Sequence, residues 1–450
     1  MLLGIYDIDM EITSENYHIM FIKLIFLPTI IILFLRPKWL FYFLIFSLLE
    51  PTRTFSLGNY VILGSVNIKF YEIILTLIYL SALWGRKRKL RECFDKTLVV
   101  FMAFALLSLI RGLIAGFGES AFNYFRTLYA MGMYIAVPLM FEDRKELFKV
   151  LKFFFIASVA MGFIELLTAT RVISLARFMR PDHRFTSFLS ATQGAILAMP
   201  FLFIFSTIKY VRRTPILTFG GSIFCFGTAV WSASRGVWLG LIACTSVIIT
   251  LLDLKRKVVV SLLVVLLALF VFVFSRHMYV ERYDTNIWNR FKSIVDSKQG
   301  TATWRLNAWW QMVQDIKQHP VIGCPFGTPS TFYVFYMGYF EEHAPHNEYL
   351  KIARYTGLLG LGVFLIFIVR IFLSGFQYMK RNPDTKSYYE VLGFLMCFLF
   401  HCVTAMFTQA FTTMVRSPFV WAIPGVITLY ILLEKEEKIK LETENLKLEA

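Results

Sequence analysis

Long apolar stretches dominate the sequence, and short polar segments separate them. The stretches are continuous rather than alternating, which favours helices over strands, and many approach the roughly 20 residues that a membrane-spanning helix needs. Backbone polar groups find no partner in lipid, so such stretches cross a membrane only as helices or as a closed barrel. The sequence therefore predicts an all-α, polytopic integral membrane protein. The thirteen candidate spans lie near residues 19–35, 39–50, 70–84, 97–115, 126–141, 149–169, 188–208, 215–233, 235–252, 257–275, 353–374, 388–409 and 417–433. Because the second stretch is short, twelve spans fit the pattern equally well.

The placement of lysine and arginine predicts how these helices are oriented. Residues 85–96 hold six basic residues, residues 142–152 hold four, and residues 209–214, 253–257 and 375–387 hold three each. Cytoplasmic loops of membrane proteins are enriched in such residues, and placing all five segments inside gives one consistent threading. This threading puts the N-terminus outside for thirteen spans and inside for twelve. It also accounts for the net charge of +16 better than nucleic-acid binding does.

Four regions follow from this threading. An N-terminal transmembrane region covers residues 1–275, and a large extracytoplasmic loop covers residues 276–352. A C-terminal transmembrane region covers residues 353–433, and a charged cytoplasmic tail covers residues 434–450.

Within the large loop, residues 301–318 predict an amphipathic helix. Apolar residues recur at helical spacing, and His319-Pro320 ends the pattern. Tryptophans such as Trp309 favour a position at a membrane interface. Arg305 shares the apolar face with Trp309 and Ile316, which is an odd place for a solvated charge. Either the helix docks on the membrane domain, where Arg305 meets an anion, or Arg305 snorkels to water.

Arginines also gather on the predicted outer side. Residues 170–187 contain Arg171, Arg177, Arg180 and Arg184 and no lysine. The guanidinium group is a rigid fork that suits phosphate oxygens and stays charged at any relevant pH. The cluster therefore indicates a phosphate or acidic-sugar ligand, and the alternative is contact with lipid headgroups.

Ser234-Arg235-Gly236 lies between two apolar runs. An arginine at the centre of a membrane helix costs about 2.5–3.5 kcal/mol on insertion scales, so its presence there favours a functional role. A position at the membrane boundary lowers that cost, and the alternative is an interface anchor.

His346 precedes a predicted membrane helix and follows Pro345. The positive end of that helix, together with arginines nearby, would keep the imidazole neutral. A neutral histidine on the outer side can accept a proton from a hydroxyl group. An ordinary helix cap is the alternative role, and His343 is a rival candidate for the base.

Other chemistry has little support in the sequence. The six cysteines show no paired spacing of a disulfide framework or zinc site, and no phosphate-binding loop of an ATPase occurs. Asp7-Ile8-Asp9 is a weak candidate for a divalent metal. We expect no metal and no cofactor, so arginine is left to stabilise charge on the outer face.

In combination, these motifs resemble the O-antigen ligase and O-antigen polymerase superfamily. The features that carry the resemblance are listed in chain order: Ser234-Arg235-Gly236, Arg305 ahead of Trp309, His319-Pro320 through Gly323 to Gly327-Thr328, and His346-Asn347 followed after nine residues by Gly357-Leu358-Leu359-Gly360. Each motif alone is weak, but their order and the large loop before the third-last span are fairly specific.

The resemblance implies a GT-C-like fold and a metal-independent inverting glycosyltransferase. Such an enzyme moves a glycan from undecaprenyl pyrophosphate to an acceptor hydroxyl at the periplasmic or extracellular face of the inner membrane. It implies that Arg235 and Arg305 bind the pyrophosphate, that Arg184 is a less secure third arginine, and that His346 activates the acceptor. The implied partners are the lipid-linked donor, a lipid A-core or glycan acceptor, membrane lipids and other polysaccharide-assembly proteins.

Three alternatives remain open at this stage. The ligase signature continues with threonine where this chain has Leu361, which favours a polymerase. A transporter or flippase for a lipid-linked sugar suits the span count, but transporters tend to place charged groups at the membrane midplane and often carry internal repeats. A membrane scaffold would leave the pattern of arginines and His346 without a role.

Overall fold

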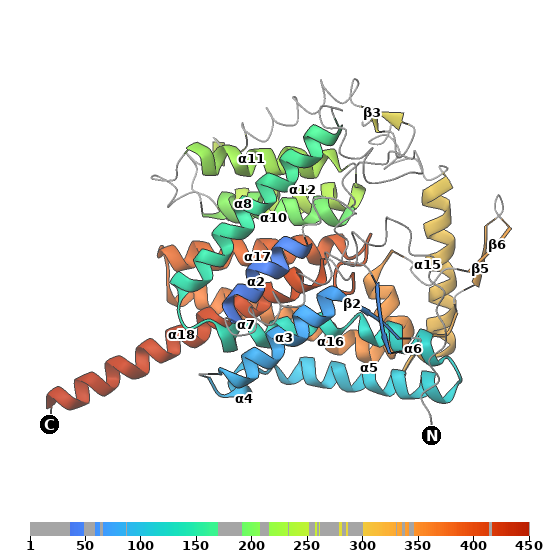
Figure 1. Ribbon diagram of the computed structural model, residues 1–450, viewed down its shortest axis with the longest axis horizontal. Coiled ribbons are helices and arrows are strands. Elements are labelled where there is room, and N and C mark those ends of the chain that lie inside the picture. The colour runs from blue at the N-terminus through green and yellow to red at the C-terminus, as the bar shows by residue number, and fades with distance from the viewer. Residues whose placement is uncertain are drawn as a thin grey trace.

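The computed structural model describes residues 37–48, 59–63, 66–86, 88–169, 191–207, 216–232, 234–251, 257–258, 261, 279–280, 285–286, 300–329, 331–334, 338–341, 346–413 and 416–449. These residues form a bundle of apolar helices that run roughly side by side across Figure 1. Residues 37–251 contribute α2 (Pro37–Leu48), α3 (Phe70–Trp84), α4 (Leu90–Cys93), α5 (Lys96–Ile114), α6 (Gly118–Arg126), η2 (Tyr129–Gly132), α7 (Met133–Met140), α8 (Arg144–Ala169), α10 (Ala191–Ser206), α11 (Ile216–Trp231) and α12 (Arg235–Leu251). Residues 300–449 contribute α15 (Gly300–Gln318), α16 (Glu348–Arg381), α17 (Lys386–Thr404) and α18 (Ser417–Glu449).

Within the described residues, the strands form three short antiparallel hairpins, and the protein belongs to the all-α class. The pairs are β1 (Asn59–Leu63) with β2 (Val66–Lys69), β3 (Tyr279–Val280) with β4 (Thr285–Asn286), and β5 (Thr331–Val334) with β6 (Gly338–Glu341).

Five of the described helices, α5, α8, α16, α17 and α18, are long and apolar enough to cross a membrane. Four shorter apolar helices accompany them within α3, α10, α11 and α12. Side chains such as Leu107, Ile366 and Val369 are about half exposed on α5 and α16, as expected of helices that face lipid. The fold is therefore that of an all-α polytopic membrane protein, as predicted. The full count of twelve or thirteen spans and the GT-C-like arrangement stay predictions, because the predicted run 19–35 and most of 257–275 lie outside the described residues.

The structure differs from the predicted pattern in the run 126–141. Instead of one span, the chain ends α6 at Arg126, makes the 3-10 turn η2, and continues as the eight-residue helix α7. Tyr79 packs so closely on the turn that a side chain at Gly132 would meet its ring. Pro138 further removes one backbone donor from α7.

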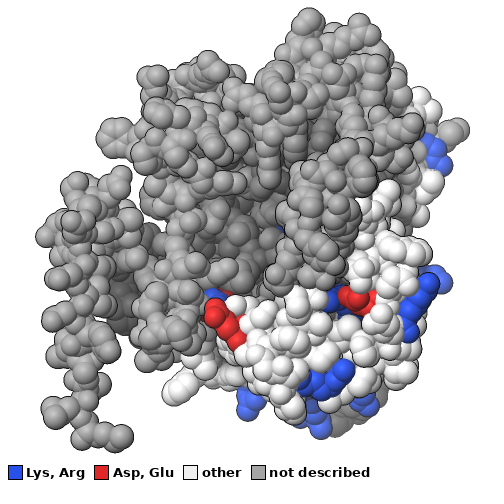
Figure 2. Space-filling view, turned by 90° about the vertical axis from the view of Figure 1, so that its right-hand side faces the viewer, with Lys and Arg blue, Asp and Glu red and all other residues white. Residues whose placement is uncertain are grey.

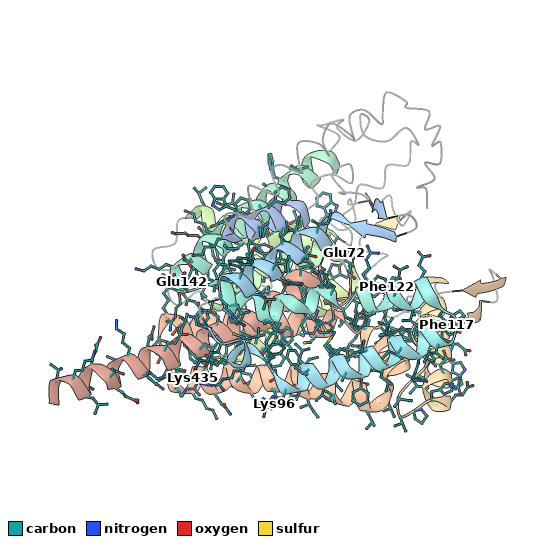
Figure 3. All side chains as sticks on the ribbon, turned by 60° about the horizontal axis from the view of Figure 1, so that its bottom comes forward. Glu72, Lys96, Phe117, Phe122, Glu142 and Lys435 are labelled. Atoms are coloured by element: carbon teal, nitrogen blue, oxygen red, sulfur yellow. The ribbon has the colours of Figure 1, made fainter. Side chains whose placement is uncertain are left out.

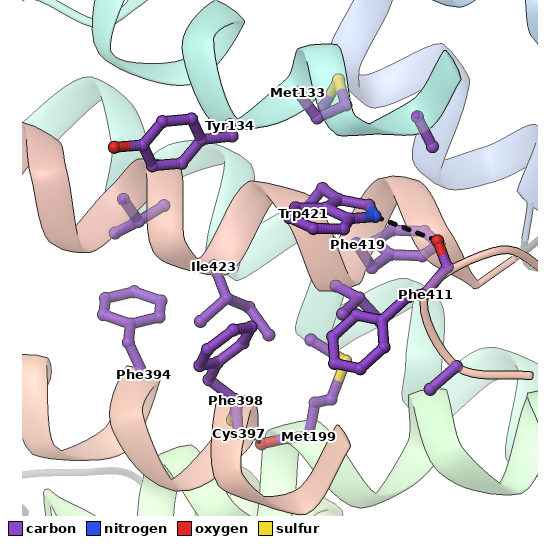
Figure 4. Packing of buried hydrophobic residues seen from close by; sticks show 14 of the residues in the cluster. Met133, Tyr134, Met199, Phe394, Cys397, Phe398, Phe411, Phe419, Trp421 and Ile423 are labelled. Carbon is purple, nitrogen blue, oxygen red and sulfur yellow. Dashed lines mark hydrogen bonds between the residues drawn. The ribbon is translucent and has the colours of Figure 1, made fainter. Parts of the chain in front are cut away.

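The core of the bundle lies between α17 and α18, with α7 and α10 packed against them. Phe398, Phe411 and Trp421 meet there with ring centroids 5.7–6.4 Å apart, and the indole N–H of Trp421 donates to the carbonyl of Phe411 at 3.0 Å (Figure 4). Both rings of this last pair are fully buried. The turn that follows α17 is thus fixed against the start of α18.

The bundle has two distinct ends. Helix α15 lies across the right-hand ends of the other helices in Figure 1, and the charged second half of α18 projects from the opposite end. Figure 3 shows Phe117 and Phe122 at the first of these, which we call the α15 end, and Glu142 and Lys435 toward the other. The predicted amphipathic helix at residues 301–318 is confirmed by α15. The boundary predicted at residue 353 falls inside α16, whose first turn belongs to the candidate site.

Candidate active site

Helix α15 is fixed to α16 by a buried ion pair. Arg354 on α16 is 1% exposed, and its Nε lies 2.6 Å from a carboxylate oxygen of Asp315 on α15. The same guanidinium group donates to the carbonyls of Thr328 and Pro329 at 3.1 and 2.9 Å. One arginine therefore joins α15, the loop that follows it and α16.

Two glycine-containing motifs that lie apart in the sequence meet at a break in α16. Gly357 has a φ of +71° within the helix, and Gly323 has the same φ in the loop after α15. The break leaves backbone groups of α16 without partners inside the helix, and the loop after α15 supplies them. Leu358 N–H donates to the carbonyl of Pro320 at 2.7 Å, and the carbonyl of Arg354 accepts from Cys324 N–H at 2.6 Å. The Gly-x-x-Gly motif thus seats the loop 319–328 on α16.

This interlock predicts that Gly357→Ala destabilises the protein. A Cβ at Gly357 would overlap the carbonyl of Val321, and the positive φ alone costs an alanine about 1–2 kcal/mol. Gly362 on the same helix has open space around it, so Gly362→Ala should leave stability unchanged or raise it slightly. Chemical unfolding in detergent measures both variants. Equal stability of the two would show that the break does not need glycine.

His346 lies just ahead of α16, in a conformation that non-glycine residues rarely adopt. Its φ is +53°, and the next residue, Asn347, caps the helix by accepting a hydrogen bond from Leu350 N–H at 3.1 Å. Burial lowers the pKa of His346 to about 4, and the positive charge of Arg305 contributes to the same shift. The imidazole is therefore neutral at physiological pH, and Arg305 of α15 is close enough to act on it.

Arg235 is the first residue of α12, beside the turn that follows α17. A Cβ at Gly236 would lie 3.1 Å from Cβ of Phe407 and 3.7 Å from the methyl group of Thr408. Two residues earlier in that turn, the carbonyl of Ala405 accepts a hydrogen bond from Glu348 N–H at 2.9 Å. Arg235 is at the start of α12, and His346 lies just before the start of α16. Both helix starts therefore border the same turn at the α15 end.

Not every predicted site residue can be placed. Arg184 and the rival base His343 lie outside the described residues. His319 is exposed at the end of α15. Figure 2 looks onto the α15 end, where basic side chains are spread over the described surface and acidic ones show in two small groups. Among the described residues, no group of three or more histidine, cysteine or acidic side chains could hold a metal ion.

Sequence reasoning missed a set of buried polar residues beneath this end. Glu348 and Lys351 on the first turn of α16 are 0% and 7% exposed, and Arg416, just before α18, is 1% exposed. Charged residues this deep in an apolar bundle are costly and need partners. The available signal was Arg416 itself, a lone arginine in a short segment between two apolar runs.

These residues form two hydrogen-bonded groups on one turn. In the first, Lys351 donates to the hydroxyl of Thr412 at 3.1 Å, and Thr412 donates to the carboxylate of Glu348 at 2.8 Å. In the second, Arg416 donates to Nδ1 of His401 at 3.0 Å and to the hydroxyl of Thr408 at 3.1 Å. The first group adjoins His346, and the second adjoins Gly236 and so Arg235.

Comparison with known proteins shows that this region matches the model of a protein family. Residues 220–365 match the model described as O-antigen ligase, Wzy_C. The match covers about a third of the chain and includes α12, α15, the interlocked glycines and the start of α16. No curated protein matches the chain.

Proposed function

With that match supporting the O-antigen ligase and polymerase superfamily, we propose that this glycosyltransferase-type enzyme moves a glycan from undecaprenyl pyrophosphate to an acceptor hydroxyl. The reaction takes place at the outer face of the cytoplasmic membrane, in the synthesis of lipopolysaccharide or another surface polysaccharide. The observation that carries the proposal is the neutral, partly buried imidazole of His346 under the influence of Arg305 within the matched region.

The proposed chemistry follows from these groups. When the anomeric C–O bond of the donor breaks, negative charge builds on the leaving pyrophosphate. Arg235 and Arg305 bind this group, and cations held in place before the reaction stabilise the transition state more than the ground state. Arg184 is a third proposed contact. His346 accepts the proton of the acceptor hydroxyl as the new glycosidic bond forms, which inverts the anomeric centre without a metal ion.

The proposal includes an orientation for the chain. The α15 end faces the periplasm or the exterior, and the charged half of α18, which begins near residue 434, lies in the cytoplasm. Regions 1–275 and 353–433 form the membrane part, and region 276–352 covers the catalytic face. The exposed Lys and Glu side chains of the tail and the basic loops support this orientation.

Arg235→Lys tests the pyrophosphate role. Lysine keeps the charge but replaces a two-pronged fork by a single point, so we expect transfer to fall about 10- to 100-fold. Arg111→Lys is the matched control, because Arg111 lies at the same end and, among the described residues, donates to the exposed carbonyl of Ile322. Transfer is measured with purified protein, a lipid-linked glycan and an acceptor supplied together. Full activity of Arg235→Lys at normal protein level would argue against the role.

The polymerase is the second candidate, and Leu361 favours it because the ligase signature has threonine there. A deletion strain separates the two on a glycan gel. A ligase mutant loses long chains from surface lipid but still builds them on the carrier. A polymerase mutant makes products with single repeats only.

A further inference from the structure

The first turn of α16 is bonded to other elements on several sides. Besides the bond from Glu348 N–H to Ala405, the hydroxyl of Tyr349 donates to the carbonyl of Cys402 at 2.8 Å. These bonds fix the backbone of the first turn, but they do not involve His346. His346 lies one residue before the cap residue, Asn347, and its positive φ is a conformation that costs energy.

A strained residue keeps its conformation only when its surroundings over-determine it. The buried group below the turn provides such surroundings. Thr412 is 4% exposed and lies between a buried cation and a buried anion, accepting from Lys351 and donating to Glu348. A hydroxyl can fill both roles at once because it has one donor and two acceptor sites. Lys351 is held on its other side by the ring of Tyr124, 5.2 Å away.

Loss of the hydroxyl would unbalance this group. The Glu348 carboxylate would lose its side-chain donor, and the Lys351 ammonium would lose its acceptor, both in an apolar interior where unmet polar groups are costly. A shift of the turn toward water would relieve that cost, and His346 is attached to the turn.

We propose that Thr412, with Glu348 and Lys351, is a positioning device that holds the strained backbone of His346 and thereby keeps the imidazole partly buried beside Arg305. Thr412 is a positioning residue and not a catalytic one, because it acts through the turn of α16. The inference rests on the proposed role of His346 as the base that activates the acceptor.

The described charged groups near His346 define what a displacement would do. Arg305 of α15 acts directly on the imidazole. Glu348 follows two residues later on α16 and is close to Lys351 and Arg416, and Arg235 begins α12 beside the turn that accepts the bond from Glu348 N–H. Burial and Arg305 both lower the pKa of His346. A displaced imidazole would be more exposed and farther from Arg305, so its pKa would rise toward the ordinary value of 6.5.

Thr412→Val and Thr412→Ser test the proposal. Valine keeps the shape and removes the hydroxyl, whereas serine keeps the hydroxyl and removes a methyl group. We expect His346 to titrate near pH 4 in the wild type and in Thr412→Ser, and at least about one pH unit higher in Thr412→Val. Histidine-labelled protein in nanodiscs gives the titration by NMR, with the resonance assigned from its loss in His346→Gln. Transfer at pH 7 should fall about 10- to 100-fold in Thr412→Val only.

The titration separates this inference from the proposed function. If Thr412→Val titrates as the wild type does, the positioning role is overturned, whatever its rate. If the pKa of His346 rises but His346→Gln transfers glycan at the full rate, the positioning role holds and the proposed function fails. Should Thr412→Val not fold, Glu348→Gln keeps an oxygen for Thr412 but removes the anion that balances the buried Lys351 ammonium. The uncompensated charge should displace the turn, so the same rise is expected, and an unchanged titration there overturns the proposal.

Discussion

Replacing His346 with alanine will lower glycan transfer by about 10²- to 10⁴-fold, the usual contribution of a general base. The folded protein should remain, because the side chain is only partly buried. His319→Ala is the matched control, since that imidazole is exposed at the end of α15, and it should keep full activity. Transfer in nanodiscs from a lipid-linked donor measures both. Loss of activity in both variants would point to a disturbed loop instead of a lost base.

The same residue sets the expected pH dependence. In the proposed mechanism the neutral imidazole is the active form, and burial and Arg305 lower its pKa to about 4. Protonation therefore begins only as the pH falls toward 4, so kcat/KM of the wild type should hold from neutral pH through 6.5 and drop near 4. A midpoint near 6.5 would show that the imidazole is exposed in the working enzyme.

Arg354→Met will destabilise the protein by about 3–5 kcal/mol, the cost of breaking a buried ion pair on one side. The change leaves the carboxylate of Asp315 without its arginine partner, and it removes a donor from the carbonyls of Thr328 and Pro329. Since α15 carries Arg305, activity should fall with stability. Chemical unfolding in detergent gives the first quantity.

A second arginine on α16 provides the control for this variant. Arg370 pairs with Asp95 at 2.9 Å, but its side chain is 54% exposed. Arg370→Met should therefore cost no more than about 1 kcal/mol. Comparable losses in the two variants would mean that burial of Arg354 is not what makes its pair important.

Much of the fold could be predicted from the sequence, because its signals are local. A continuous apolar run is enough to locate a membrane helix such as α5 or α12, and helical spacing is enough to locate α15. The order of the motifs also pointed to one region, in which the structure seats Gly323 against Gly357 and places Arg305 near His346.

The remainder depends on contacts between distant residues. Thr412 bonds to Glu348 and Lys351, which lie more than sixty positions away in the sequence. A threonine in a short loop gives no sequence signal of such partners. The positive φ of His346 has no local signal either, since histidine does not demand it. The break before α7 depends on the ring of Tyr79 filling the space beside Gly132, which no pattern in residues 126–141 reveals.

The interlocked glycines also limit how substrates can reach the site. If α15 swung away from α16 like a lid, the N–H groups of Cys324 and Leu358 would lose their partners in a largely apolar setting, at a cost of several kcal/mol. Hinged opening at this seam is therefore disfavoured. Under the proposed function, the lipid-linked donor would therefore enter the site from a side other than the seam between α15 and α16.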